Sequence, residues 1–115
     1  MKQPISIIRG TNQTINIRLQ SAYGSQYILQ DGQVIRFGVK KNPDSKSYLI
    51  LKELSNAEFE NDSYVLLLTP ADTENMAFGC YHYDVGLQSG VSYFNVIECS
   101  NFEVKHNITE RKVGE

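Results

Sequence analysis

Apolar and polar residues alternate with a period of two over most of this chain. Ile15, Ile17 and Leu19, for example, are separated by Asn16 and Arg18. The same pattern recurs in three further segments, residues 34–40, 80–88 and 102–108. This alternation is typical of β-strands with one buried and one exposed face, whereas an amphipathic helix repeats every 3.6 residues. The chain is therefore predicted to be all-β.

Turn-forming residues divide the chain into short strands. Asn42-Pro43-Asp44-Ser45 suits a type I turn, because proline sets φ at the second position. The expected strands are residues 4–9, 13–20, 34–41, 47–53, 63–69, 79–88, 91–98 and 101–108. Short strands at regular spacing predict an antiparallel β-sandwich of about seven or eight strands. We expect residues 1–109 to form this single domain and residues 110–115 to form a flexible C-terminal tail.

One segment breaks the period of two. Thr69 suits a helix N-cap, Pro70 suits the first helical position, and Asp72 favours the positive end of a helix. Gly79 is typical of the residue that follows a helix. We therefore predict one short crossover helix near residues 70–77, which carries the chain from one sheet to the other.

The strand parity also predicts the core. Side chains on the inward face of each strand are expected to be buried between the sheets. These residues are Ile15, Ile17, Leu19, Ile35, Phe37, Val39, Leu67, Tyr83, Val85, Phe94 and Val96.

Composition and motifs argue against several classes of function. The net charge of −2 over 115 residues provides no basic excess for nucleic acid, and no apolar run is long enough to cross a membrane. The chain has no phosphate-binding loop, no nucleophile elbow and no HExxH metal motif. We expect neither an enzyme nor a bound cofactor or metal, and no nucleic-acid or membrane partner.

The two histidines are the candidate chemical groups of the chain. His82 and Asp84 share one face of a predicted strand, with Cys80 beside them, so a metal ion or a Cys–His nucleophile is conceivable there. A solvated strand face is the simpler interpretation. His106 alternates with apolar residues and is interpreted as a partly buried polar residue near a strand end.

Tyrosine is the one enriched residue type, with seven in the chain and no tryptophan. Aromatic enrichment is a weak indication of an interaction surface. Tyr23 and Tyr27 lie in the long predicted loop 20–33 and are the candidate contact residues. A carbohydrate-binding accessory module that uses these exposed rings is one function they would suit.

The two cysteines are expected to face each other across a hairpin. A turn at Ser89-Gly90 places Cys80 opposite Cys99 in one ladder. We expect two reduced thiols with a structural role, because the apolar run near the N-terminus is too short for a signal peptide and a cytosolic origin is expected.

The order of three motifs resembles a known family. They are Arg9-Gly10-Thr11 at the end of the first strand, Leu68-Thr69-Pro70-Ala71-Asp72-Thr73 at the helix, and Gly79-Cys80-Tyr81-His82-Tyr83-Asp84-Val85 on the next strand. Over residues 7–109 the chain is similar to the immunoglobulin-like N-terminal domain of the upper baseplate protein of tailed phages and prophages. The resemblance marks eight motif residues, Thr69, Pro70, Asp72, Thr73, Gly79, Tyr81, Tyr83 and Asp84.

This resemblance implies a structural function without catalytic residues. The chain would be a virion tail protein, assembled in the cytoplasm of the bacterial host. It would dock to other tail or baseplate proteins, or to its own copies, and help to carry receptor-binding or fibre components. Carbohydrate binding is the alternative function.

Overall fold

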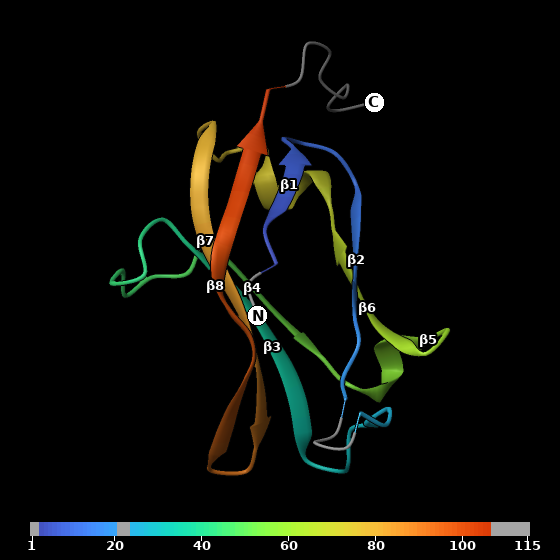
Figure 1. Ribbon diagram of the computed structural model, residues 1–115. Helices are drawn as coiled ribbons and strands as arrows, with labels where there is room; N and C mark the ends of the chain where they lie inside the picture. The colour runs from blue at the N-terminus through green and yellow to red at the C-terminus, as the bar shows by residue number, and fades with distance from the viewer. Residues whose placement is uncertain (1–2, 21–23, 107–115) are drawn as a thin grey trace.

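Two β-sheets face each other in the computed structural model, which describes residues 3–20 and 24–106 (Figure 1). The strands are β1 Ile5–Ile8, β2 Gln13–Ile17, β3 Gln33–Lys40, β4 Ile50–Leu54, β5 Phe59–Glu60, β6 Ser63–Leu68, β7 Gly79–Ser89 and β8 Ser92–Lys105. The larger sheet has the order β1-β8-β7-β3-β4, and the smaller has the order β2-β6-β5. The prediction of an all-β fold built from two sheets is confirmed.

One strand pair departs from the antiparallel expectation. β1 runs parallel to β8, with Ile5 beside Phe102 and Ile8 beside Lys105. The two strands predicted at residues 91–98 and 101–108 are one long strand, β8, since Cys99-Ser100-Asn101 continues the strand instead of turning. The two-residue strand β5 was not predicted.

The core lies between the two sheets and is centred on aromatic rings. Phe37 is fully buried, and its ring centroid lies 5.4 Å from that of Tyr83 and 6.3 Å from that of Phe102. Most of the predicted core residues are buried as expected: Ile17, Leu19, Ile35, Phe37, Val39, Tyr83 and Val85. Ile15 and Val96 are half-buried and pack against this core.

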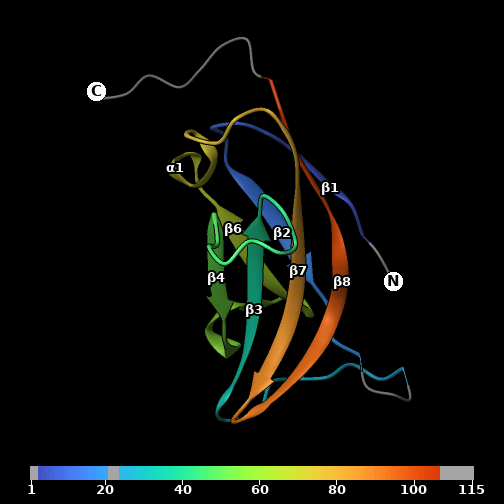
Figure 2. The ribbon, with the colours of Figure 1, turned by 90° about the vertical axis from the view of Figure 1, so that its left-hand side faces the viewer.

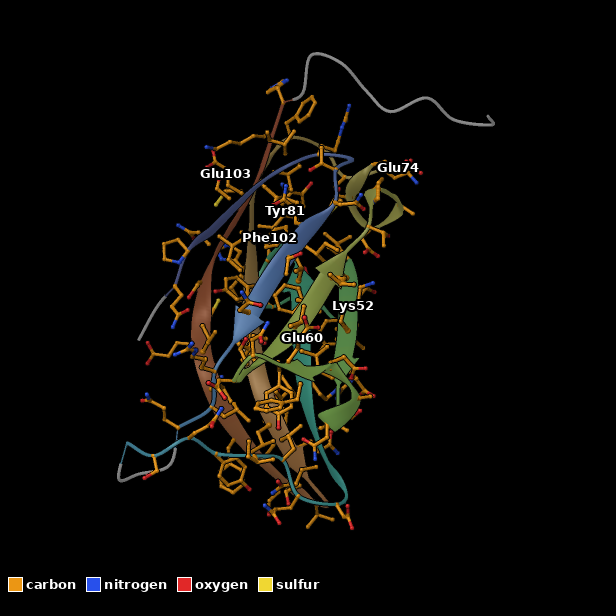
Figure 3. The ribbon with its side chains drawn as sticks, turned by 90° about the vertical axis from the view of Figure 1, so that its right-hand side faces the viewer. Lys52, Glu60, Glu74, Tyr81, Phe102 and Glu103 are labelled. Carbon is orange, nitrogen blue, oxygen red and sulfur yellow. The ribbon has the colours of Figure 1, made fainter. Side chains whose placement is uncertain are left out.

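Two core predictions are wrong, for different reasons. Leu67 is 60% exposed, and its neighbours Leu66 and Leu68 are buried instead. The run Tyr64–Leu68 is apolar at every position, so its parity does not show which face turns inward. Phe94 is 57% exposed although it lies opposite Leu87 on the inner side of the larger sheet. It is exposed because β3, β7 and β8 extend past the end of the smaller sheet (Figure 2).

The crossover helix α1 is shorter than predicted and spans Pro70–Thr73. Thr69 is its N-cap and Pro70 its first residue, as expected. The chain then leaves the helix by a tighter turn, in which Met76 N–H donates to Thr73 C=O at 2.9 Å. Gly79 does not end the helix but begins β7, with a φ of +140°.

A short 3-10 helix, η1 Asn56–Glu58, was not predicted. Its N-cap is Ser55, whose backbone N–H donates to Glu58 Oε1 at 2.7 Å. Serine followed three residues later by glutamate is the sequence signature of a capping box. That signal was present in the sequence and could have identified this turn.

The predicted register of the β7–β8 hairpin is also wrong. Ser89 pairs with Ser92, so the two turn residues are Gly90 and Val91. Gly90 has a φ of +59°, which suits the first central position of a type II′ turn, where glycine is favoured. Two register shifts follow along the ladder, between Tyr83 and Gly86.

As a result, the cysteines do not face each other. Cys80 pairs with Glu103, four positions away from Cys99 on β8. Both cysteines are exposed and free. The prediction of two adjacent thiols is therefore wrong, because the hairpin turn lies one residue later than expected and the β-bulges move the register further.

Candidate interaction surface

The motif residues of the crossover gather at one end of the sandwich. Thr73 is fully buried, and its Oγ1 accepts a hydrogen bond from Gly10 N–H at 2.8 Å. Thr69 N–H donates to Asp72 Oδ2 at 2.7 Å, and the same carboxylate oxygen lies 3.1 Å from Lys52 Nζ on β4. Helix α1 is thus tied to the turn after β1 and to the edge strand of the larger sheet.

The charge of Asp72 is stabilised by these contacts. Partial burial by itself raises the pKa of the carboxyl group, but the Thr69 backbone bond and the Lys52 ammonium outweigh it. The net result is a lowered pKa. Asp72 therefore remains ionised under ordinary conditions and stabilises the first turn of the helix.

The remaining motif residues lie on β7. Tyr81 and Tyr83 are buried between the sheets, and their hydroxyls donate to Ala77 C=O at 2.6 Å and to Gln3 C=O, respectively. Asp84 lies on the opposite, outer face of the sheet, as its place in the alternation requires. Of the eight motif residues, the structure thus gives the two tyrosines a packing role and leaves Asp84 half-buried on the outer face.

Two tyrosine rings lie over glycines on this outer face. A Cβ built on Gly38 would lie 2.6 Å from Tyr48 Cε1, and one built on Gly86 would lie 1.9 Å from Tyr93 Oη. The rings occupy the space above the sheet that side chains would otherwise fill. Tyr48 and Tyr93 are nonetheless 47% and 53% exposed, so each ring also faces solvent.

Asp84 lies in a shallow hollow of this outer face. The lining residues are Gly38, Lys40, Pro43, Tyr48, His82, Tyr83, Asp84 and Cys99. Burial raises the pKa of Asp84, and the charge of Lys40 opposes that effect. Burial and the Asp84 charge together raise the pKa of Tyr93.

The two histidines lie on different strands of the larger sheet or at their ends: His82 lies on β7, and His106 follows β8. His82 shares the hollow with Asp84, whereas Cys80 lies outside it. Across residues 3–20 and 24–106, no group of three or more His, Cys, Asp or Glu side chains could hold a metal ion. His106 is exposed instead of partly buried, and its ring stacks on Phe78 at a centroid separation of 3.5 Å. It directly follows Lys105, the last residue of β8, and so lies beyond the end of that strand.

An apolar groove opens at the other end of the molecule, where the hairpin extends past the smaller sheet. We call it the hairpin groove. Its apolar lining is formed by Leu19, Tyr27, Leu87, Phe94 and Val96. Its polar lining is formed by Arg18, Gln20, Gln33 and Asn95. Figure 2 shows the β7–β8 hairpin extending past the end of the smaller sheet here. Phe94 on this hairpin is 57% exposed.

Gln33 holds one wall of the groove in place. Its Oε1 accepts hydrogen bonds from Tyr27 Oη and Gln30 N–H, both at 2.8 Å, and its Nε2 donates to Ser89 Oγ at 3.2 Å. The segment before β3 is therefore anchored to the tip of the hairpin, at the last residue of β7. These hydrogen bonds hold the Tyr27 side of the groove against β3 and β7.

A second set of hydrogen bonds fixes the same segment to the smaller sheet. Tyr64 Oη accepts from Leu29 N–H at 2.8 Å and donates to Asn56 Oδ1 at 2.7 Å, and Asn56 Nδ2 donates to Leu29 C=O at 2.8 Å. The buried polar groups of Leu29 are thereby satisfied. Sequence reasoning missed this network, because its members lie far apart in the chain.

The two tyrosines proposed as contact residues have different outcomes. Tyr27 is half-buried, its ring packs against the core, and its hydroxyl is bonded to Gln33. It contributes to the wall of the hairpin groove and does not stand free as a platform. Tyr23 lies outside the described residues.

One edge of the larger sheet is open beside the groove. β1 pairs with β8 only over Phe102–Lys105. Within the described part of the chain, the segment Ser92–Asn101 has no strand neighbour on that side. Tyr93 and Phe94 are both more than half exposed along it. Figure 1 shows this lower half of β8 extending away from β1.

Comparison with known proteins adds no further assignment. No protein-family model matches the chain, and no curated protein matches it significantly. No helix in the described residues is long and apolar enough to span a membrane.

Proposed function

We propose that this chain is a non-enzymatic structural module of a phage or prophage tail baseplate, acting by contact with other tail proteins. The proposal combines the motif order of the sequence with a sandwich of two β-sheets. The immunoglobulin-like character of that sandwich belongs to the same proposal. The chain would dock to the tail in the host cytoplasm and help to carry receptor-binding or fibre components.

The observation that favours protein contact is the exposure of the hairpin groove. Phe94 is 57% exposed beside Leu87 and Val96, which are only partly buried. Contiguous exposed apolar side chains with a polar rim are typical of protein interaction sites. The lining is also held by the Gln33 hydrogen bonds, so little ordering would be needed on binding.

A complementation experiment tests this proposal. The gene is deleted from the phage or prophage genome and supplied in trans as wild-type, Phe94→Ser or Leu67→Ser. Leu67 is the matched control, since it is 60% exposed but lies in β6 of the smaller sheet. We expect deletion of the gene to abolish adsorption of the phage to its host. The wild-type and Leu67→Ser genes are expected to restore adsorption, and the Phe94→Ser gene is expected not to restore it. Normal adsorption after deletion would contradict the proposed function.

The alternative, carbohydrate binding, is favoured by one observation on the outer face. The half-exposed ring of Tyr48 borders the hollow that holds Asp84 and Lys40, so an apolar surface and two polar groups lie together. Titration with mono- and disaccharides, followed by tyrosine fluorescence, tests it. Saturable binding that Tyr48→Ala removes would support this alternative over the baseplate proposal.

A further inference from the structure

We propose that two copies of this chain pair edge to edge through the open side of β8, with Phe94 of one copy against Phe94 of the other. This inference rests on the proposed function as an assembly module and names one partner and one surface for it. The pairing would join two larger sheets into one continuous sheet across a two-fold axis. Each copy would contribute the segment Ser92–Val96.

The backbone geometry of the hairpin leaves groups free to pair. Ser89 and Ser92 flank a two-residue turn and are therefore a hydrogen-bonded pair of the ladder. Hydrogen-bonded and non-hydrogen-bonded pairs alternate from there. Tyr93 and Asn95 consequently direct their backbone N–H and C=O groups away from β7, towards the open side.

The edge lacks the features that commonly prevent strand pairing. Residues 91–97 read Val-Ser-Tyr-Phe-Asn-Val-Ile and contain neither a charge nor a proline. Natural edge strands are often protected by lysine, proline, bulges or short length. β4 has Lys52 and Glu53 on its open edge, and β1 spans four residues after Pro4. Between the hairpin turn and Asn95, β8 has no charge, proline or bulge; its first bulge lies at Val96 and ends this stretch.

The same lack of charge favours a second copy as the occupant. When the same strand of two copies pairs antiparallel across a two-fold axis, side chains of one segment meet side chains of the identical segment. Like charges placed opposite each other would then repel. Residues 92–96 carry no charge, so no like charges meet within the paired segment. The free backbone groups of Tyr93 and Asn95 set the register: Tyr93 of one copy lies opposite Asn95 of the other, and Phe94 lies opposite Phe94.

This register also explains the exposed ring of Phe94. In a non-hydrogen-bonded antiparallel pair the Cα atoms are about 4.5 Å apart, and aromatic pairs there are favourable. The two Phe94 side chains would cover each other and join the hairpin grooves of the two copies. The bulges near Val85 limit the flat segment to a few residues, so the interface is small and the dimer is expected to be weak.

Sedimentation velocity of the purified chain tests the inference, at concentrations from about 10 µM to about 1 mM, the range expected for a small interface. We expect the weight-average mass of the wild-type to rise towards that of a dimer. Phe94→Lys places two like charges opposite each other and is expected to remove this rise. Leu67→Lys, an equally exposed charge change on the smaller sheet, is expected to leave it unchanged.

Two further variants test the register. Asn95→Pro removes a backbone N–H that makes no ladder hydrogen bond within the monomer. The variant is therefore expected to fold, to show a thermal unfolding transition, and to remain monomeric. Phe94→Cys, in a chain with Cys80→Ser and Cys99→Ser, is expected to form a disulfide dimer under mild oxidation. Leu67→Cys in the same background is the control that should not do so.

The outcomes separate this inference from the proposed function. A folded wild-type chain that stays monomeric over the whole range would overturn the edge pairing. A dimer that persists in Phe94→Lys and Asn95→Pro would overturn it as well, because it would use another surface. Either result leaves the complementation experiment free to support or reject the baseplate function.

Discussion

The backbone N–H of Gly10 donates a hydrogen bond to Thr73 Oγ1 across 2.8 Å, and this bond links the turn after the first strand to the crossover helix. Thr73 is fully buried, so the bond is shielded from water. Gly10 has a φ of +73°, a conformation that glycine adopts readily. Two motifs that are 63 residues apart in the sequence are thereby joined at one end of the fold.

Substitution of Thr73 tests the importance of this link. Thr73→Val has nearly the same shape but no acceptor, so it leaves the Gly10 N–H unsatisfied. We expect a loss of about 1–3 kcal/mol in the free energy of unfolding, measured by urea denaturation. Thr73→Ser keeps the acceptor and is expected to cost less. If the two variants were equally stable, the hydrogen bond would have no measurable role.

The lowered pKa of Asp72 predicts a dependence of stability on pH. A carboxyl group whose pKa is lower in the folded state stabilises that state above its unfolded pKa, and the stabilisation is lost as the pH falls through the folded value. The loss is therefore expected below about pH 4. Asp72→Asn lacks the charge, so its melting temperature should be lower than that of the wild-type at pH 7. This difference in melting temperature should be smaller at pH 3. An equal difference at both pH values would contradict the role of the charge.

Removal of core and surface side chains tests the assignment of faces. Phe37→Ala creates a cavity at the centre of the aromatic cluster and is expected to cost about 3–5 kcal/mol. Leu67→Ala removes a side chain that is mostly exposed and is expected to cost less than about 0.5 kcal/mol. Chemical denaturation of both variants measures the difference. Similar costs would mean that the inward faces of β3 or β6 are assigned wrongly.

The contact between Gly86 and Tyr93 predicts non-additive effects. Gly86→Ala places a methyl group where the Tyr93 hydroxyl lies, so the ring must move and the variant is expected to lose about 1 kcal/mol. In Tyr93→Ala the space is empty, and the same change is expected to be neutral or slightly stabilising. A double-mutant cycle measures the coupling. Equal effects in both backgrounds would show that the ring does not occupy this position.

The period of two was sufficient to predict the sheets, because alternation follows directly from strand geometry. It could not predict the face of Leu67, where every neighbour is apolar, nor the exposure of Phe94, which depends on how far the other sheet extends. The hairpin register needed one additional fact, that Gly90 takes the first position of its turn. The bulges beyond it depend on packing across the sheets and left no clear signal in the sequence.

The candidate surface was harder to predict than the fold. Tyr27 was selected as an exposed aromatic residue, but its place in the groove depends on a hydrogen bond to Gln33. The open edge of β8 was not located from the sequence, because the 91–98 and 101–108 segments were interpreted as two strands. An edge exists only once the neighbours of a strand are known, and those neighbours are set by the topology of the whole sheet.

If this chain is a structural component of a phage tail, as proposed, it must be present in purified phage particles. Tailed particles are purified from the strain that encodes the chain, and peptides of the chain are quantified by mass spectrometry against those of the major tail protein. The account predicts a fixed, low copy number per particle that remains after stringent washing. Absence of the chain from particles with intact tails would contradict the account.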